Sequence, residues 1–345
     1  LALTSPFHVP QGQTVIPQAI VERSENAANR QETQSRPDCM PCAECTAMVT
    51  YLTPDMETQK HRSESATLYI DYPTGVYDVR REFHNNRPEL EKLDSLMRPL
   101  TEGNLANISS ISICGYASPD GTYKDNEILA SNRARCFKEY MHTTYAPEHD
   151  LYKVSSVPED WDGLVELLQL RPMNHGDEVL SLIARTSIFE GREKQLMDMY
   201  GGTVYRELLK SYFPQLRRIR ITVGYEARAF NIEEAASLIY THPRLLSLQE
   251  MYRVAAFYRP GTEQYREIYE IAAYHFPDDV LANINAASAV IMAGDPVSAR
   301  QYLNKVADDP RAWNDFGVLA YLEGDRKKAE KWFRKALGIE PEKAR

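Results

Sequence analysis

The chain has 345 residues, a formal net charge of −9 at pH 7 and a sequence pI near 5.5. This length suffices for two or three domains with cores of their own. With no basic stretch to offset it, the acidic balance argues against nucleic-acid binding. No stretch approaches the roughly twenty apolar residues that cross a bilayer, so we expect no transmembrane span in this chain.

The N-terminal residues have the composition of a tail. Residues 1–36 are polar, rich in Gln, Ser, Asn and Pro, and show no sustained period. We therefore predict a poorly ordered N-terminal segment over residues 1–60. The stretch is no complete signal peptide, so we expect any export signal to lie outside this sequence.

Three cysteines in this segment, Cys39, Cys42 and Cys45, have C-x-x-C-x-x-C spacing. The spacing fits zinc or iron–sulfur ligation, a disulfide with one thiol left over, or free thiols. A structural zinc site requires a fourth ligand, and this stretch is polar and Pro-rich rather than a pair of hairpin strands. The cysteines are therefore weak metal candidates, and we expect no cofactor.

Residues 111–141 predict a strand, a tight turn and a helix. Residues 111–114, Ile-Ser-Ile-Cys, alternate as in a strand with one buried face. Residues 118–121, Ser-Pro-Asp-Gly, supply turn residues. A helix capped by Asp125 or Asn126 follows. Its apolar stripe consists of Ala130, Ala134, Phe137 and Met141.

Arg133 lies beside this apolar stripe and can lean back towards the turn. Its guanidinium would meet backbone amides, Ser118 and Asp120 in a small polar pocket. Arginine binds carboxylates bidentately and exposed amides add donors, so such a pocket suits an anion. The alternative is an ordinary surface arginine on an amphipathic helix.

The spacing of this stretch resembles the peptidoglycan-binding domain at the C-terminus of OmpA and its relatives. That family shows Gly-His-Thr-Asp, then Gly, Asn, Leu-Ser and Arg-Ala, and the same gaps occur here. The corresponding residues are Gly115-Tyr116-Ala117-Ser118, Gly121, Asn126, Leu129-Ala130 and Arg133-Ala134. The resemblance implies an α+β OmpA-like domain over residues 61–228 that binds the diamino acid of the peptidoglycan stem peptide.

In that family the aspartate of the first motif and the arginine of the last grip the diamino acid. Arg133 holds the arginine position, but Ser118 stands where the family has the aspartate. A hydroxyl cannot supply a charge-assisted hydrogen bond to an ammonium group. Either Asp120 takes over this role, or the domain has weakened, changed or lost its ligand. The peptidoglycan-binding residues implied by the resemblance are Ser118, Asp120, Asn126, Arg133, Arg217 and Arg218, of which the last two add positive charge unless they are simply solvated.

Further segments resemble other elements of the same domain. Residues 67–72 resemble its first strand and residues 86–97 its first helix. Residues 153–157 and 217–223 resemble its third and closing strands. An insertion at about 160–212 carries helical patterns. We expect its helices to cover one side of the sheet and reshape one wall of the pocket.

Residues 229–345 contain an internal repeat. Pro277, Pro310 and Pro341 are separated by 33 and 31 residues, and an apolar helical run precedes each proline. Large and small residues recur in an order that resembles tetratricopeptide repeats, with a third, weaker unit before Pro277. Small residues let paired helices approach while aromatic residues fill the gaps between pairs. We therefore expect an all-α domain of tetratricopeptide-like helical repeats.

The concave surface of such an array binds peptides or other proteins, so the repeats predict a protein partner. A rigid helical spacer is the alternative. The candidates for the groove wall of the last repeat are Arg311, Asn314, Tyr321 and Leu322.

Common catalytic signatures are missing from the sequence. It has no Gly-x-Ser-x-Gly, His-Glu-x-x-His, phosphate-binding glycine loop or dinucleotide fingerprint, so we expect a non-enzymatic protein. The domain order resembles envelope proteins of Bacteroidetes-type bacteria, which implies a periplasmic, outer-membrane-associated location in a Gram-negative bacterium. One expected function is binding of peptidoglycan together with an unidentified envelope protein. The alternative is an envelope assembly scaffold whose OmpA-like domain no longer binds peptidoglycan.

Overall fold

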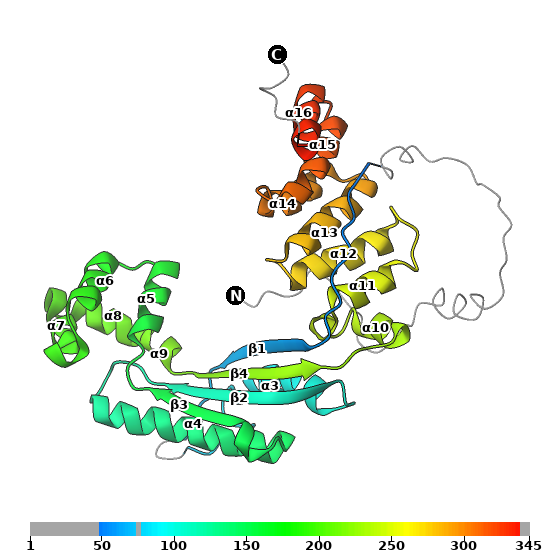
Figure 1. Cartoon of the computed structure of the whole chain (residues 1–345). Helices are drawn as coiled ribbons and strands as arrows, with labels where there is room; N and C mark the ends of the chain where they lie inside the picture. The colour runs from blue at the N-terminus through cyan, green and yellow to red at the C-terminus, as the bar shows by residue number, and fades with distance from the viewer. Residues whose placement is uncertain (1–47, 74–76, 339–345) are drawn as a thin grey trace. The chain divides into compact units, whose positions relative to one another are not determined.

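A computed structural model describes residues 48–73 and 77–338 of the chain (Figure 1). The protein has an α+β fold in two compact units. One unit is His61–Ala227, and the other combines residues up to Lys60 with Arg228–Arg345. Residues 48–60 therefore belong with the C-terminal helices.

A four-stranded sheet forms the centre of the His61–Ala227 unit in the described residues, with strand order β1-β4-β2-β3. Strand β2 runs antiparallel to β4 and parallel to β3. The strands are β1 (Lys60–Leu68), β2 (Ala106–Tyr116), β3 (Tyr152–Val157) and β4 (Ile219–Ala227). The third strand and the closing strand thus overlap residues 153–157 and 217–223, where the resemblance implied them.

Helices α3 (Asn86–Thr101) and α4 (Tyr123–Tyr145) both contact β2. Ile111 and Ile113 are fully buried on the covered face of this strand, whereas Ser112 points to the other face and is exposed. Gly115 continues the covered face, and a Cβ atom there would meet the carbonyl oxygen of Ala130 on α4. The missing side chain lets the helix lie close to the strand.

The first strand lies earlier in the chain than residues 67–72, where the sequence predicted it. Strand β1 ends at Leu68, and the next residues run as coil beside the start of α3. There the amide of Tyr69 donates to Glu89 Oε2 at 3.0 Å, and the amide of Asp71 donates to Asn86 Oδ1 at 2.7 Å. Side-chain acceptors on the helix thus take the backbone donors that a sheet would otherwise use.

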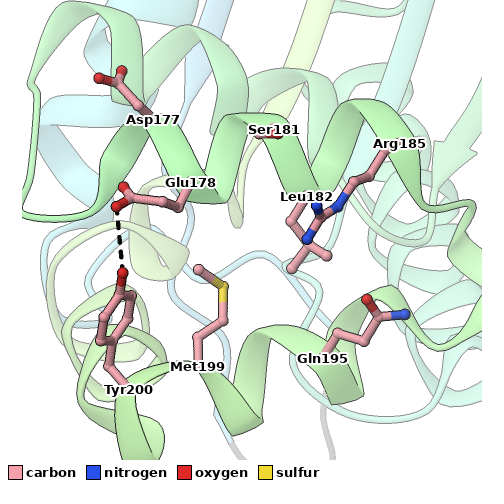
Figure 2. A pocket seen from close by; sticks show the side chains of 8 residues that line it. All are labelled: Asp177, Glu178, Ser181, Leu182, Arg185, Gln195, Met199 and Tyr200. Carbon is pink, nitrogen blue, oxygen red and sulfur yellow. Dashed lines mark hydrogen bonds between the residues drawn. The ribbon is translucent and has the colours of Figure 1, made fainter.

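The insertion after β3 consists of short helices that lie beyond the end of the strands (Figure 1). They are α5 (Trp161–Leu170), α6 (Gly176–Arg185), α7 (Arg192–Asp198), α8 (Thr203–Ser211) and α9 (Phe213–Leu216). Residues of α6 and α7 and the turn that follows α7 line a surface hollow of about 440 Å³ (Figure 2).

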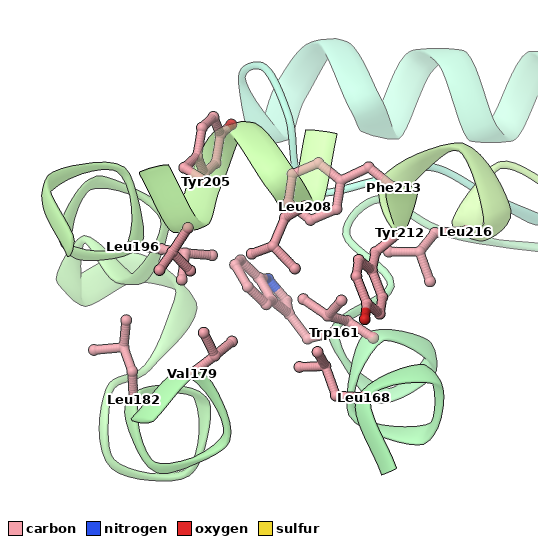
Figure 3. Close-up of a cluster of buried hydrophobic side chains, with 12 residues drawn as sticks. Trp161, Leu168, Val179, Leu182, Leu196, Tyr205, Leu208, Tyr212, Phe213 and Leu216 are labelled. Atoms are coloured by element: carbon pink, nitrogen blue, oxygen red, sulfur yellow. The ribbon is translucent and has the colours of Figure 1, made fainter. Parts of the chain in front are cut away.

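The insertion has a hydrophobic core of its own (Figure 3). Leu164 and Phe213 are fully buried within it, and Trp161 is almost so. The amphipathic helices bury their apolar faces against one another. The expectation that they cover one side of the sheet is therefore wrong.

The second unit is helical apart from residues 48–60. Its helices are α10 (Ile232–Leu238), α11 (Leu248–Ala255), α12 (Glu263–His275), α13 (Val280–Met292), α14 (Pro296–Lys305), α15 (Trp313–Leu322) and α16 (Arg326–Ala336). From α10 to α16 each helix contacts the next in sequence. The Phe316 ring stacks on Trp332, with centroids 4.7 Å apart. A Cβ at Gly317 would meet the Phe333 ring, so glycine allows α16 to approach α15.

Candidate functional site

The turn between β2 and α4 is built by its own side chains. Thr122 caps α4, because its hydroxyl accepts the amide of Asp125 at 3.1 Å. The expected caps, Asp125 and Asn126, instead lie inside the first turn of the helix. Asn126 donates from Nδ2 to the carbonyl oxygens of Ser118 at 3.0 Å and Asp120 at 3.2 Å. Asn126 therefore shapes the turn, while Gly121 supplies the positive φ of 102° that the turn requires.

Ser118, Asp120 and Arg217 form a hydrogen-bonded cluster at this turn. The Ser118 hydroxyl donates to Asp120 Oδ1 and accepts from Arg217 Nε at 2.8 Å. Arg217 also donates from a terminal nitrogen to Asp120 Oδ2 at 2.7 Å. The side chains of Arg217 and Asp120 remain 42% and 28% exposed, so a ligand can reach this ion pair. Asp120 thus has the negative charge that Ser118 lacks.

Arg133 extends from α4 with a guanidinium that is half buried. Its Nε is buried without a hydrogen-bond partner, and no carboxylate pairs with this side chain in residues 48–73 and 77–338. The guanidinium carbon lies 5.2 Å from the ring centroid of Tyr72, whose buried hydroxyl also has no partner. Burial lowers the pKa of Arg133, and the positive charge of Arg217 lowers it further.

The two arginines and Asp120 give this region its chemistry. Arg217 already forms an ion pair with Asp120. Arg133 lies beside the ring of Tyr72 and has no counter-ion among the described residues. A carboxylate can bind a guanidinium with two parallel hydrogen bonds. An ammonium group can bind Asp120. We call Ser118, Asp120, Arg133, Arg217 and Tyr72 the turn site.

Arg218 does not belong to the turn site, although the sequence suggested it. Its guanidinium pairs with Asp160, and the two side chains are only 9% and 4% exposed. It also lies 4.5 Å from the ring centroid of Tyr116. Both arginines precede β4; Arg217 reaches the turn, whereas Arg218 is directed to the start of α5. Arg218 has a structural role in the fold.

Of the four residues expected in the repeat groove, Asn314 alone contacts residues 48–52, which we call the strap. Asn314 Nδ2 donates to the carbonyl oxygen of Met48 at 2.7 Å. Arg311 instead pairs with Asp309 at 2.8 Å. Tyr321 and Leu322 are 46% and 39% exposed, and no strap contact of theirs is found in the described residues. Those three positions do not contact the strap in the described residues, and their role in partner binding stays a prediction.

The strap lies across α13 and α15 in an extended course (Figure 1). Leu52 makes two hydrogen bonds with Asn285: its amide donates to Oδ1 and its carbonyl oxygen accepts from Nδ2, both at 2.7 Å. The Thr50 amide donates to Asp315 Oδ1 at 2.7 Å. Ser288 Oγ lies 2.5 Å from the Thr50 carbonyl oxygen and 2.6 Å from Asp315 Oδ2. Burial raises the pKa of Asp315 to about 6.

Sequence reasoning missed three residues of this groove, Asn285, Ser288 and Asp315. A signal for two of them was present: Asn285 and Ser288 are three residues apart in the stretch 280–292, which is apolar apart from these two residues and Asn283, so they share one face of the helix. Tyr72 was also missed, because its stretch read as a strand. We call Asn285, Ser288, Asn314 and Asp315 the strap groove.

The hollow of the helical insertion is a weaker candidate. Across it, Arg185 of α6 lies opposite Gln195 of α7, and Glu178 of α6 lies opposite Tyr200 (Figure 2). Tyr200 donates from its hydroxyl to Glu178 Oε1 at 3.3 Å, and its ring stacks on His175. These contacts are exposed and join residues of the insertion to one another, so they indicate no particular ligand.

The cysteine cluster Cys39, Cys42 and Cys45 lies outside the described residues. Within residues 48–73 and 77–338, no group of His, Cys, Asp and Glu side chains is arranged to hold a metal ion. Cys114 and Cys136 are half-buried free thiols.

No protein-family model matches this chain, and no curated protein matches it. None of the helices in the described residues has both the length and the apolar character of a membrane span.

Proposed function

We propose that the chain is a non-enzymatic cell-envelope protein that binds the diamino acid of the peptidoglycan stem peptide at the turn site. The observation that carries this proposal is the guanidinium of Arg133. It is half buried, lies near the positive charge of Arg217 and has no carboxylate partner in the described residues. Burying a cation without an anion is costly, so the turn site is electrostatically complementary to a ligand carboxylate.

The exposed pair of Asp120 and Arg217 suits the other half of such a ligand. The free end of a diamino acid has an ammonium and a carboxylate on one carbon. Its ammonium can take the place of Arg217 at Asp120, while its carboxylate binds Arg133 and the released Arg217. Ser118 then acts through its hydrogen bond to Asp120, which holds the carboxylate in position. This arrangement replaces one internal ion pair by charge-assisted contacts to both ends of a zwitterion.

Purified sacculi test the proposal by co-sedimentation with the full chain. Loss of a charged hydrogen-bond partner costs about 1.5–3 kcal/mol, so Arg133→Ala should bind at least about tenfold more weakly than the wild type. Arg135→Ala is the matched control, because Arg135 is an exposed arginine on the same helix. If the wild type does not bind, or if Arg133→Ala binds as well as the wild type, the turn site is not a peptidoglycan site.

A titration with small molecules tests whether the turn site recognises the carboxylate of the diamino acid. In an NMR titration, diaminopimelate should shift the resonances of residues around the turn site, because both of its ends carry an ammonium and a carboxylate. Cadaverine has two ammonium groups and no carboxylate, so it cannot engage Arg133 and should cause no comparable shifts. Equal effects of the two compounds would show that Asp120 alone is responsible.

The proposal includes an envelope protein as partner of the helical unit and a periplasmic, outer-membrane-associated location. The strap groove supports partner binding, because it already holds an extended segment of polypeptide. The alternative is an assembly scaffold that has lost peptidoglycan binding, and Ser118 and the internal pairing of Asp120 favour it. A scaffold should recover the same partner from solubilised membranes with and without Arg133→Ala, while neither form binds sacculi.

A further inference from the structure

The strap groove recognises the main chain of its occupant. Three alternate strap residues, Met48, Thr50 and Leu52, present carbonyl oxygens to side chains of α13 and α15, and the last two also present amides. A spacing of two residues is that of an extended strand. Because these hydrogen bonds involve backbone atoms of the strap, segments with many different sequences can make them when they adopt the same conformation.

The groove side chains depend on such an occupant for their hydrogen bonds. Asn285, Ser288 and Asp315 are 1%, 0% and 0% exposed, and all residues from Ala282 to Met292 on α13 are buried. Each buried polar group left without a partner costs about 1–3 kcal/mol. Two such groups on α13 and one on α15 are therefore matched to an extended main chain.

The side chains of the strap indicate what kind of sequence fits. Met48, Val49 and Leu52 pack against the core of the repeat helices. The Tyr51 ring lies 5.5 Å from the ring of Tyr269, measured between centroids, and its hydroxyl lies 3.1 Å from the sulfur of Met292. No strap residue is charged. The groove thus suits an uncharged, extended segment with large apolar side chains and one tyrosine or similar ring.

We propose that the strap groove is a receptor for an extended, apolar segment of a partner protein, and that residues 48–52 are its resident intramolecular ligand, which the partner must displace. This inference rests on the proposed function only in that the helical unit binds a protein. It adds the kind of segment that the partner presents, and it adds that this segment must compete with the strap for the groove.

The tether gives the strap an advantage over any segment in solution. Residues 53–59 are mostly exposed and join the strap to Lys60, which is anchored on Glu250. A short flexible tether corresponds to an effective concentration on the order of 1 mM. A free peptide with an intrinsic Kd of about 10 µM would then bind the intact protein about 100-fold more weakly.

A fluorescent peptide with the sequence of residues 48–53, Met-Val-Thr-Tyr-Leu-Thr, tests the proposal by anisotropy with the full chain. The double variant Thr50→Pro, Leu52→Pro removes both strap amides that donate to the groove. It should bind the peptide at least about tenfold more tightly than the wild type does. Thr53→Pro is the matched control and should bind like the wild type, because the Thr53 amide makes no hydrogen bond in the described part of the chain.

A groove substitution locates the binding. Adding Asn285→Ala to the double variant should abolish the gain, whereas Asn283→Ala on the same helix should preserve it, because Asn283 bonds only to Pro277 and Asp279. Equal peptide binding by wild type and double variant, no binding by either, or a gain that survives Asn285→Ala would each overturn the proposal.

Hydrogen exchange on the unaltered chain decides the matter if the double variant misfolds. The amides of Thr50 and Leu52 should be protected, and millimolar unlabelled peptide should accelerate their exchange. Unchanged protection at saturating peptide would refute displacement. Sedimentation of the wild type tests the other occupant: a concentration-dependent dimer that the peptide dissociates would assign the strap to a second copy and refute the intramolecular ligand. None of these measurements involves sacculi, so their failure leaves the turn site as proposed.

Discussion

Glu250→Gln breaks a buried ion pair that anchors the end of the segment containing the strap. Lys60 Nζ lies 3.1 and 2.9 Å from the two carboxylate oxygens of Glu250 and 3.0 Å from the carbonyl oxygen of Leu245. The two charged side chains are only 4% and 8% exposed. The carboxylate also accepts the amides of Phe230 and Ser247, both at 2.7 Å. All three donors point at one anion.

Glutamine has nearly the shape of glutamate, but it is neutral and replaces one acceptor oxygen by a donor. The buried Lys60 then loses the negative charge of Glu250, and removing one partner of a buried pair costs about 3–5 kcal/mol. Glu234→Gln is a matched control. Like Glu250, Glu234 is the third residue of a capping box and pairs with a cation, Arg228. These side chains are 35% and 38% exposed, so the control should lose at most about 1 kcal/mol.

Urea denaturation followed by tryptophan fluorescence measures the difference. Trp313 and Trp332 lie in the helical unit, whereas Trp161 is the only tryptophan of the other unit. A Trp161→Phe background therefore reports on the helical unit alone. With a slope of about 2 kcal/mol/M, Glu250→Gln should lower the midpoint by about 2 M. A loss below about 1 kcal/mol, or one equal to that of Glu234→Gln, would refute the assignment of Glu250 as the anion that stabilises the buried Lys60.

Two further changes test local features of the structure. Gly115→Ala places a Cβ against the carbonyl oxygen of Ala130, so it should destabilise the His61–Ala227 unit by about 2 kcal/mol; an unchanged thermal midpoint would contradict the close packing of α4 on β2. Burial lowers the pKa of His275 from 6.5 to about 4, so between these values the unfolded state binds more protons and stability falls as the pH drops. His275→Gln should remove a loss on the order of 1 kcal/mol between pH 6.5 and 4, allowing for the partial exposure of this side chain, and parallel pH profiles of the two proteins would contradict this effect.

The sequence predicted those elements whose signal is local. Alternating residues located β2 and β4, the family resemblance located β3, and turn chemistry located the reversal at residues 118–121. The first strand was misplaced because residues 69–72 are apolar enough for a strand, while distant side chains of α3 take their amides. The cap was misassigned because Thr122 competes with two good capping residues, of which Asn126 is engaged with the turn carbonyls. Both errors arose because side-chain hydrogen bonds decide where the strand ends and which residue caps the helix. The periodicity of the sequence does not reveal such hydrogen bonds.

The candidate sites also depend partly on contacts that the sequence does not reveal. Spacing singled out Arg133 and Asp120, but two adjacent arginines in a sequence reveal neither the pairing of Asp120 with Arg217 nor the burial of Arg218 against Asp160. The strap groove was harder still, because its occupant is more than 200 residues distant in sequence from Asn285. Two polar residues on one face of a mostly apolar helix predict that these side chains have a hydrogen-bond partner. They do not identify the segment that supplies it.

The partners of the buried polar groups distinguish the two sites functionally. At the strap groove the chain supplies those partners itself, so an outside ligand must compete, and affinity depends on how readily residues 48–52 leave. At the turn site the chain supplies an anion for Arg217 but none, among the described residues, for Arg133. A zwitterion binding there exchanges an exposed ion pair, which costs little, and gains a counter-ion for a half-buried guanidinium. We therefore expect the turn site to bind its ligand directly and the strap groove to bind only when the strap is displaced.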